Sequence, residues 1–128
     1  MPERRQYKRS RSPQLLTVID IYADQQIGTL VDLSLGGILM MAMQPIPLHR
    51  VFQLQVKLPE KILGSDTIEF GAESVWGDPP EQMGTCWSGF HIIDISEENK
   101  ALVTELVERW SQEDEASKNK TGAVKLSG

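Results

Sequence analysis

The chain of 128 residues contains one cysteine, Cys86, and no long run of apolar residues. A single cysteine cannot form an internal disulfide, and such scarcity is typical of proteins in a reducing cytosol. A membrane-spanning helix needs about 18 consecutive apolar residues, which the sequence does not provide. No apolar segment follows the charged N-terminus, so we expect no secretory signal. These absences predict a cytoplasmic protein without membrane insertion.

Aromatic residues are also few, at 6%. His49, His91 and Cys86 are too few and too unevenly spaced to form a zinc site. The sequence contains no Walker-type phosphate loop and no constellation of acid, base and nucleophile. We therefore expect no metal site, no cofactor and no enzymatic activity.

Charge is distributed unevenly along the chain. Residues 1–11 carry five cations and one acid, a net charge of +4, whereas the whole chain carries −5, so residues 12–128 sum to −9. An acidic body repels a long polyanion, which disfavours a DNA- or RNA-binding barrel, but a short basic arm can still hold a small anion. The same arm could equally be a solvated leader.

Six segments of alternating or β-branched apolar residues, separated by turn signals, predict six β-strands. They are residues 15–22, 27–33, 38–43, 51–58, 67–76 and 84–95, and the first two are expected to pair as a hairpin. Pro13 marks the break before the first strand, and Pro59 is expected to end the fourth, because proline donates no hydrogen bond to a sheet. Short strands in this number favour a small antiparallel barrel, since closure removes exposed sheet edges.

One helix is predicted after the strands. Ser96 is suited to the N-cap position, and the acidic residues after it favour the positive helix N-terminus. Apolar residues spaced by three and four form one face, namely Leu102, Val103, Leu106, Val107 and Trp110. This periodicity ends at Gln112, so we expect a flexible basic arm at residues 1–12, a barrel with its helix at 13–111 and a disordered polar tail at 112–128.

Two short motifs contain the candidate binding residues. Arg5 and Arg9 form an Arg-x-x-x-Arg pair, while Asp32, Ser34 and Gly37 form Asp-x-Ser-x-x-Gly at the end of the second predicted strand. Guanidinium groups present forked donors that match a phosphate or the O6/N7 edge of guanine. A carboxylate can accept the N1–H and N2–H of guanine, and glycine permits unusual backbone and a close approach. Either motif alone is more often structural, because Asp, Ser and Gly also favour turns.

Together, in this order, the two motifs resemble the PilZ domain family. In that family the arginine pair precedes the first strand and Asp/Asn-x-Ser-x-x-Gly follows the second. Residues 73–76 and 89–96 resemble the family's strand ending in tryptophan and its last strand, so the similarity covers roughly residues 3–110. The resemblance implies a mainly β fold, a six-stranded antiparallel β-barrel with a C-terminal α-helix. It also implies binding of the bacterial second messenger cyclic diguanylate (c-di-GMP).

By this resemblance, Arg5 and Arg9 contact the guanine edges and phosphates, and Asp32, Ser34 and Gly37 hold a guanine on the barrel surface. Arg4 is a secondary candidate that could stack on or bridge a second guanine. The resemblance implies a receptor in motility or biofilm signalling. Binding of the nucleotide would order the basic arm, and the ordered arm would pass the signal to an unidentified protein effector. An adaptor of the same fold that binds proteins and no nucleotide remains the alternative. We expect a monomer or a weak dimer.

Overall fold

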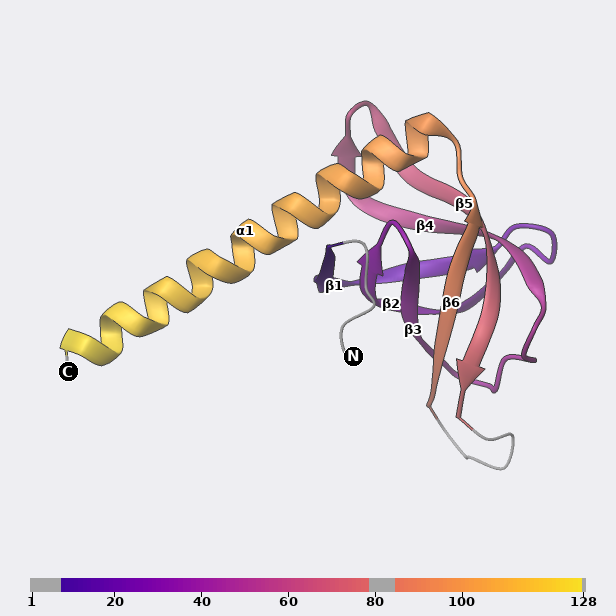
Figure 1. The fold of residues 1–128 in the computed structure, drawn as a ribbon, viewed down its shortest axis with the longest axis horizontal. Coiled ribbons are helices and arrows are strands. Elements are labelled where there is room, and N and C mark those ends of the chain that lie inside the picture. The colour runs from indigo at the N-terminus through magenta and orange to yellow at the C-terminus, as the bar shows by residue number, and fades with distance from the viewer. Residues whose placement is uncertain (1–7, 79–84, 128) are drawn as a thin grey trace.

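The computed structural model describes residues 8–78 and 85–127, with the side chains of residues 8–78 and 85–113. Six strands are followed by one helix (Figure 1). They are β1 (Arg9–Asp20), β2 (Gln25–Ser34), β3 (Gly37–Ala42), β4 (Val51–Ile62), β5 (Ser65–Gly77), β6 (Cys86–Asp94) and α1 (Glu97–Ser127). The strands are antiparallel and close into a barrel in the order β1-β2-β3-β6-β5-β4. The predicted six-stranded antiparallel barrel with a C-terminal helix is confirmed.

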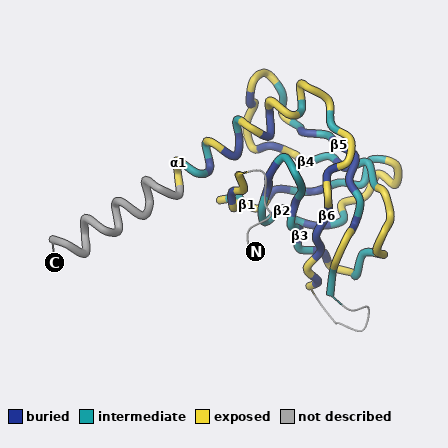
Figure 2. The backbone as a smooth tube through the Cα atoms, viewed as in Figure 1, coloured by how far each residue is buried: buried dark blue, intermediate teal, exposed yellow. Residues whose placement is uncertain are grey.

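The barrel interior is filled by alternate apolar side chains from all six strands. Figure 2 marks the buried positions along the backbone of the barrel. The largest of those that are fully enclosed are Phe70, Leu30, Leu33, Met40, Leu54 and Ile68. The predicted apolar face of α1 is buried against this core, because all five of its side chains belong to the same cluster. Burial of apolar surface on this scale is the main driving force for the fold.

The first strand begins at Arg9, well before the predicted start at Leu15. Pro13 does not break the strand, because the pairing of β1 with β2 shifts between Arg11 and Leu16 and leaves the proline in a bulge. Bulge residues need not donate to the ladder, so proline is tolerated there. The boundary that we expected at residue 12, between a flexible arm and the barrel, therefore falls inside β1.

The fourth strand likewise continues through Pro59, which we had expected to end it. Its pairing with β5 shifts between Lys57 and Ile62, so this proline also lies in an irregular part of the ladder. β1 and β4 pair with each other over only three residue pairs, centred on Ile19 and Gln55. The seam between these two strands is consequently the least hydrogen-bonded in the barrel, and it needs another element to complete it.

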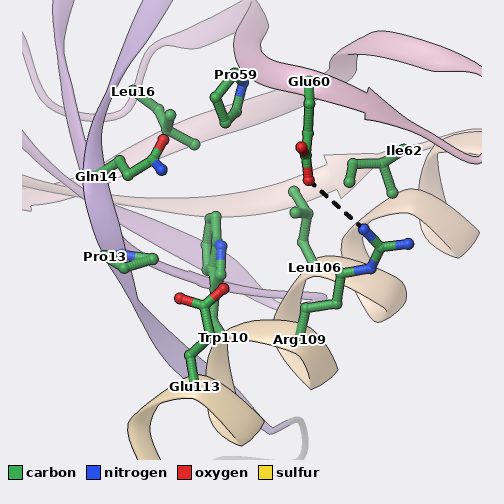
Figure 3. Close-up of a pocket in the computed structure, with 10 residues that line it drawn as sticks. All are labelled: Pro13, Gln14, Leu16, Pro59, Glu60, Ile62, Leu106, Arg109, Trp110 and Glu113. Carbon is green, nitrogen blue, oxygen red and sulfur yellow. Dashed lines mark ion pairs between the residues drawn. The ribbon is translucent and has the colours of Figure 1, made fainter. Parts of the chain in front are cut away.

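The helix α1 supplies that element. Figure 3 shows Leu106 and Trp110 on α1 facing the bulged parts of β1 and β4. A small pocket remains where the three elements meet, and its apolar lining is Pro13, Leu16, Pro59, Ile62, Leu106 and Trp110. Arg109 lies beside it, 3.9 Å from a carboxylate oxygen of Glu60 and 2.8 Å from one of Glu105. The helix is thus joined to β4 by both packing and charge.

The ends of α1 agree only partly with the sequence. The hydroxyl of Ser96 accepts a hydrogen bond from the backbone N–H of Asn99 at 3.1 Å, so the predicted N-cap is present. The helix then continues to Ser127, through most of the segment 112–128 that we expected to be a disordered tail. This segment contains three Lys, two Glu and two Ala, whose helix propensity does not depend on apolar periodicity. No helix within the described residues is long and apolar enough to cross a membrane.

Two leucines test the role of α1. Leu106 is 3% exposed against the barrel, whereas Leu15 is 88% exposed in the β1 bulge. We expect Leu106→Ala to lower the free energy of unfolding by about 2–5 kcal/mol, because it leaves a cavity beneath the helix. Leu15→Ala, the matched control, should change it by less than about 0.5 kcal/mol. Chemical denaturation measures both, and equal losses would contradict the assignment of α1 to the core.

Candidate functional site

A bulge in β2 makes Asp32 face outward. Gly28 and Leu30 point into the barrel, and strict alternation would turn Asp32 inward as well. The pairing of β2 with β3 shifts between Leu30 and Asp32, where Val31 is the additional residue. After this bulge Leu33 is buried, and the Asp32 side chain lies on the outer surface with 19% of its area exposed. The bulge therefore re-aims a carboxylate from the core to the surface.

The turn from β2 to β3 is held by the hydroxyl of Ser34. This oxygen accepts hydrogen bonds from the backbone N–H groups of Gly36 and Gly37, both at 3.1 Å. It also donates to the carbonyl oxygen of Gly37 at 3.3 Å. Because Ser34 is buried and its hydroxyl is engaged within the turn, its first role is to set the shape of the loop beside Asp32.

Gly37 is explained by a close approach of two strands. A Cβ atom at this position would collide with the carbonyl oxygen of Phe90 on β6. The carbonyl of Gly36 also accepts a hydrogen bond from the backbone N–H of Ile92 at 2.9 Å, which fixes the turn to β6. We had expected the paired glycines to adopt backbone conformations closed to other residues. Among the described glycines, however, only Gly64 has a positive φ, so the expected backbone reason is wrong.

The pairing of β1 with β2 brings Arg9 to Asp32. Arg9 lies opposite Ser34, and its Nε atom is 3.9 Å from Oδ2 of Asp32. The two side chains are 39% and 19% exposed, so solvent screens this ion pair and it adds only about 0–1 kcal/mol of stability. Arg9 of the Arg-x-x-x-Arg motif and Asp32 of the Asp-x-Ser-x-x-Gly motif therefore lie side by side on the outer face of β1 and β2.

Arg4 and Arg5 lie outside the described residues, so their position relative to Asp32 stays a prediction. The other predicted contacts, Arg9, Asp32, Ser34 and Gly37, come from the start of β1, the end of β2 and the first residue of β3. Their spatial grouping is a fact of the structure, and their contact with a ligand remains a prediction.

Trp76 extends this outer face, although sequence reasoning did not include it among the binding residues. Asp32 lies opposite Leu39, Leu39 opposite Gly89, and Gly89 opposite Trp76 in successive strand pairs. A Cβ on Gly89 would collide with the indole, so the ring of Trp76 lies across β6, with the residue 49% exposed. Because neighbouring strands are about 4.8 Å apart, the ring of Trp76 lies two to three strand spacings from Asp32. Only the strand register reveals this relation.

Other chemistry finds less support in the described part of the chain. Its side chains include no group of three or more His, Cys, Asp and Glu that could hold a metal ion. Cys86 is buried in the barrel, where its thiol packs as a small apolar side chain.

The molecule is a closed barrel in which a cation and a carboxylate are paired beside a turn held by a serine hydroxyl. The chain belongs to the PilZ domain family, whose model matches residues 3–109. The fold is shared with the PilZ domain of YcgR from Escherichia coli, solved with c-di-GMP. That comparison gives a TM-score of 0.68 at 18% identity, over 92% of this chain and 99% of that one.

Two longer structures are also similar. YcgR from Escherichia coli in complex with c-di-GMP gives a TM-score of 0.70 at 20% identity, over 93% of this chain and 51% of that one. The inhibitor of motility MotI/DgrA from Bacillus subtilis gives 0.67 at 16% identity, over 88% and 53%. The chain therefore spans about half the length of these two proteins, and identities this low show the fold alone. No curated protein matches the sequence.

Substitutions at Ser34 and at Asp32 should lower the free energy of unfolding by different amounts. Ser34→Ala removes the acceptor of two backbone N–H groups, so we expect it to lower the free energy of unfolding by about 1–3 kcal/mol. Asp32→Ala removes a screened ion pair, so it should cost less than about 1 kcal/mol. Urea denaturation of both variants checks this, and an Asp32→Ala loss as large as that of Ser34→Ala would contradict the roles assigned to them.

Proposed function

We propose that this protein is a receptor for c-di-GMP that binds the nucleotide on the outer face of β1, β2 and the turn after β2. The observation that carries the proposal is the meeting of Arg9 and Asp32 at 3.9 Å. The ligand combines two phosphates with two guanines. A guanidinium group suits a phosphate or the O6/N7 edge, and a carboxylate suits the N1–H and N2–H donors.

The Arg9–Asp32 pair is weak enough to be replaced by a ligand. A single contact at 3.9 Å between partly exposed groups contributes little, so little is lost when it opens. Guanine N–H groups then take the place of Arg9 on the carboxylate, and a phosphate takes the place of Asp32 on the guanidinium. Trp76 offers an aromatic surface on which a purine can stack. Both charges keep a partner throughout the exchange.

The similar proteins support this choice of ligand and setting. Two of the structures are of YcgR with c-di-GMP, and MotI is described as an inhibitor of motility. On this basis we infer a bacterial cytoplasmic receptor in motility or biofilm signalling. It takes c-di-GMP as a ligand rather than a cofactor and has no catalytic activity of its own. It passes the signal to an unidentified protein effector. We infer that it is a monomer or a weak dimer and that it does not bind nucleic acid.

Base selectivity tests the proposed function. Adenine lacks the O6 acceptor and the N1–H and N2–H donors, and a mispaired polar group costs about 1–3 kcal/mol. Calorimetric titration should therefore give a dissociation constant for c-di-GMP that is lower, by about tenfold or more, than that for its cyclic adenine analogue. Asp32→Ala should weaken binding of the guanine ligand and reduce this difference. Equal affinity of the parent for both ligands would contradict the guanine assignment, and no binding of either would favour the adaptor.

The relay inferred from the sequence needs one correction. We expected the basic arm, residues 1–12, to become ordered on binding, but residues 9–11 are paired with β2 in the structure. An arm that orders on binding is thus confined to residues before Arg9. Ordering of that shorter arm remains part of our proposal, because two phosphates would neutralise its clustered cations.

The start of β1 also contacts α1, which offers a second route for the signal. The buried hydroxyl of Ser10 donates to the carbonyl oxygen of Val107 at 2.9 Å and lies 2.6 Å from Oγ of Ser111. Nζ of Lys8 is 3.4 Å from Oε2 of Glu108. Since Arg9 faces the nucleotide side and Ser10 faces the helix, we infer that a ligand-induced shift of β1 is passed to α1.

Hydrogen exchange can test this relay. Saturation with c-di-GMP should increase the protection of the amides of residues 4–8 and change that of residues 107–111. Ser10→Ala should still bind the nucleotide, because its hydroxyl faces the helix, but the change in α1 should be lost. If residues 4–8 and 107–111 exchange as in the free protein while calorimetry shows saturation, the proposed relay is wrong, and the proposal that the protein binds c-di-GMP is unaffected.

A further inference from the structure

Arg11 occupies the same face of β1 as Arg9, and neither motif of the sequence includes it. The strand alternates here, so Arg9 and Arg11 are exposed while Ser10 between them is buried. In the register of β1 with β2, Arg11 lies directly opposite Asp32. Residues two apart in a strand are about 6.8 Å apart on one face. The carboxylate of Asp32 therefore has an arginine on each of two neighbouring positions of the adjacent strand.

The charges at this point do not balance. Two guanidinium groups share one carboxylate, and the ion pair that forms joins Arg9, not Arg11, to Asp32. Within the described residues no acidic side chain forms an ion pair with Arg11. The face of β1 consequently carries one net positive charge beside Asp32, which favours an anion next to whatever the carboxylate holds.

The backbone fixes Arg11 at this place. It forms the last regular pair with β2 before the bulge that contains Pro13, so the pairing with Asp32 determines where its side chain starts. Residues directly opposite each other in an antiparallel pair have Cβ atoms about 4.5–5.5 Å apart. A group bound by the carboxylate of Asp32 is therefore within reach of the long Arg11 side chain.

We propose that Arg11 is a further cationic contact for the nucleotide, and that it pairs with the phosphate next to the guanine held by Asp32. The inference rests on the proposed function and deepens it. Once guanine N–H groups occupy Asp32, the negative groups left for Arg11 are the phosphate oxygens, which a guanidinium can bind through two parallel hydrogen bonds. The spacing of Arg9 and Arg11 suits a ligand with two separate phosphates.

The test is a calorimetric titration of the full chain with c-di-GMP, using three variants. Arg11→Ala should weaken binding about tenfold or more, as the loss of a charge-assisted hydrogen bond does. Arg11→Lys, which keeps the charge but not the forked donors, should bind with intermediate affinity. Lys57→Ala is the control, because it loses the same charge at an exposed position of β4, opposite Thr67, and should bind within about twofold of the parent.

Each outcome decides between the proposals. Parent-like binding by Arg11→Ala overturns the assigned contact and leaves the proposed function standing. Equal weakening by Arg11→Ala and Lys57→Ala shows an effect of net charge and also overturns it. Failure of the parent to bind overturns both proposals. Because Arg11 is exposed, thermal unfolding of its variants should match the parent, and a matched melting temperature together with weakened binding supports the contact.

Discussion

One irregularity in strand pairing determines where both the site and the helix lie. Between the pairs Arg11–Asp32 and Leu16–Leu30, β1 has four residues and β2 has only Val31. In the pairing of β2 with β3, Val31 is itself an extra residue, because Leu30 and Asp32 pair with the consecutive residues Met40 and Leu39. It reverses the alternation and puts Asp32 outside while the core stays apolar. On the β1 side, the long bulge carries the chain toward α1. A regular ladder would bury the carboxylate and remove the surface against which Trp110 packs.

The site and the core are therefore mechanically connected through a short piece of β1. The alternation of side chains sends Arg9 to the outer face beside Asp32 and the hydroxyl of Ser10 to the carbonyl of Val107. The position of the cation thus depends on a helix that is held by its buried apolar face, including Leu106. A binding site at the edge of a rigid core needs no large rearrangement to be sensed elsewhere, because small shifts in packed elements are not absorbed locally.

The sequence predicted what local patterns control. The number of strands, the apolar face of α1 and the Ser96 cap all follow from spacing and residue type, and the structure agrees with them. It could not predict the two prolines inside strands, because a bulge is defined by the partner strand. The reasons for Gly37 and Gly89 were also hidden, since their close neighbours, Phe90 and Trp76, become adjacent only through strand register.

The strength of the contacts around Asp32 bears on how such a site can work. A buried, bidentate arginine–aspartate pair would be costly to open, and it would compete with any ligand for both groups. The observed contact is single, long and partly exposed, so it holds the two side chains near one another. Opening such a weak ion pair would subtract little from the free energy of ligand binding. Arg11 adds a second cation, and the single negative charge of Asp32 is already paired with Arg9. The proposed ligand, an anion with two phosphates and hydrogen-bond donors on a flat ring, would match all three groups at once, which neither a simple anion nor a neutral base does.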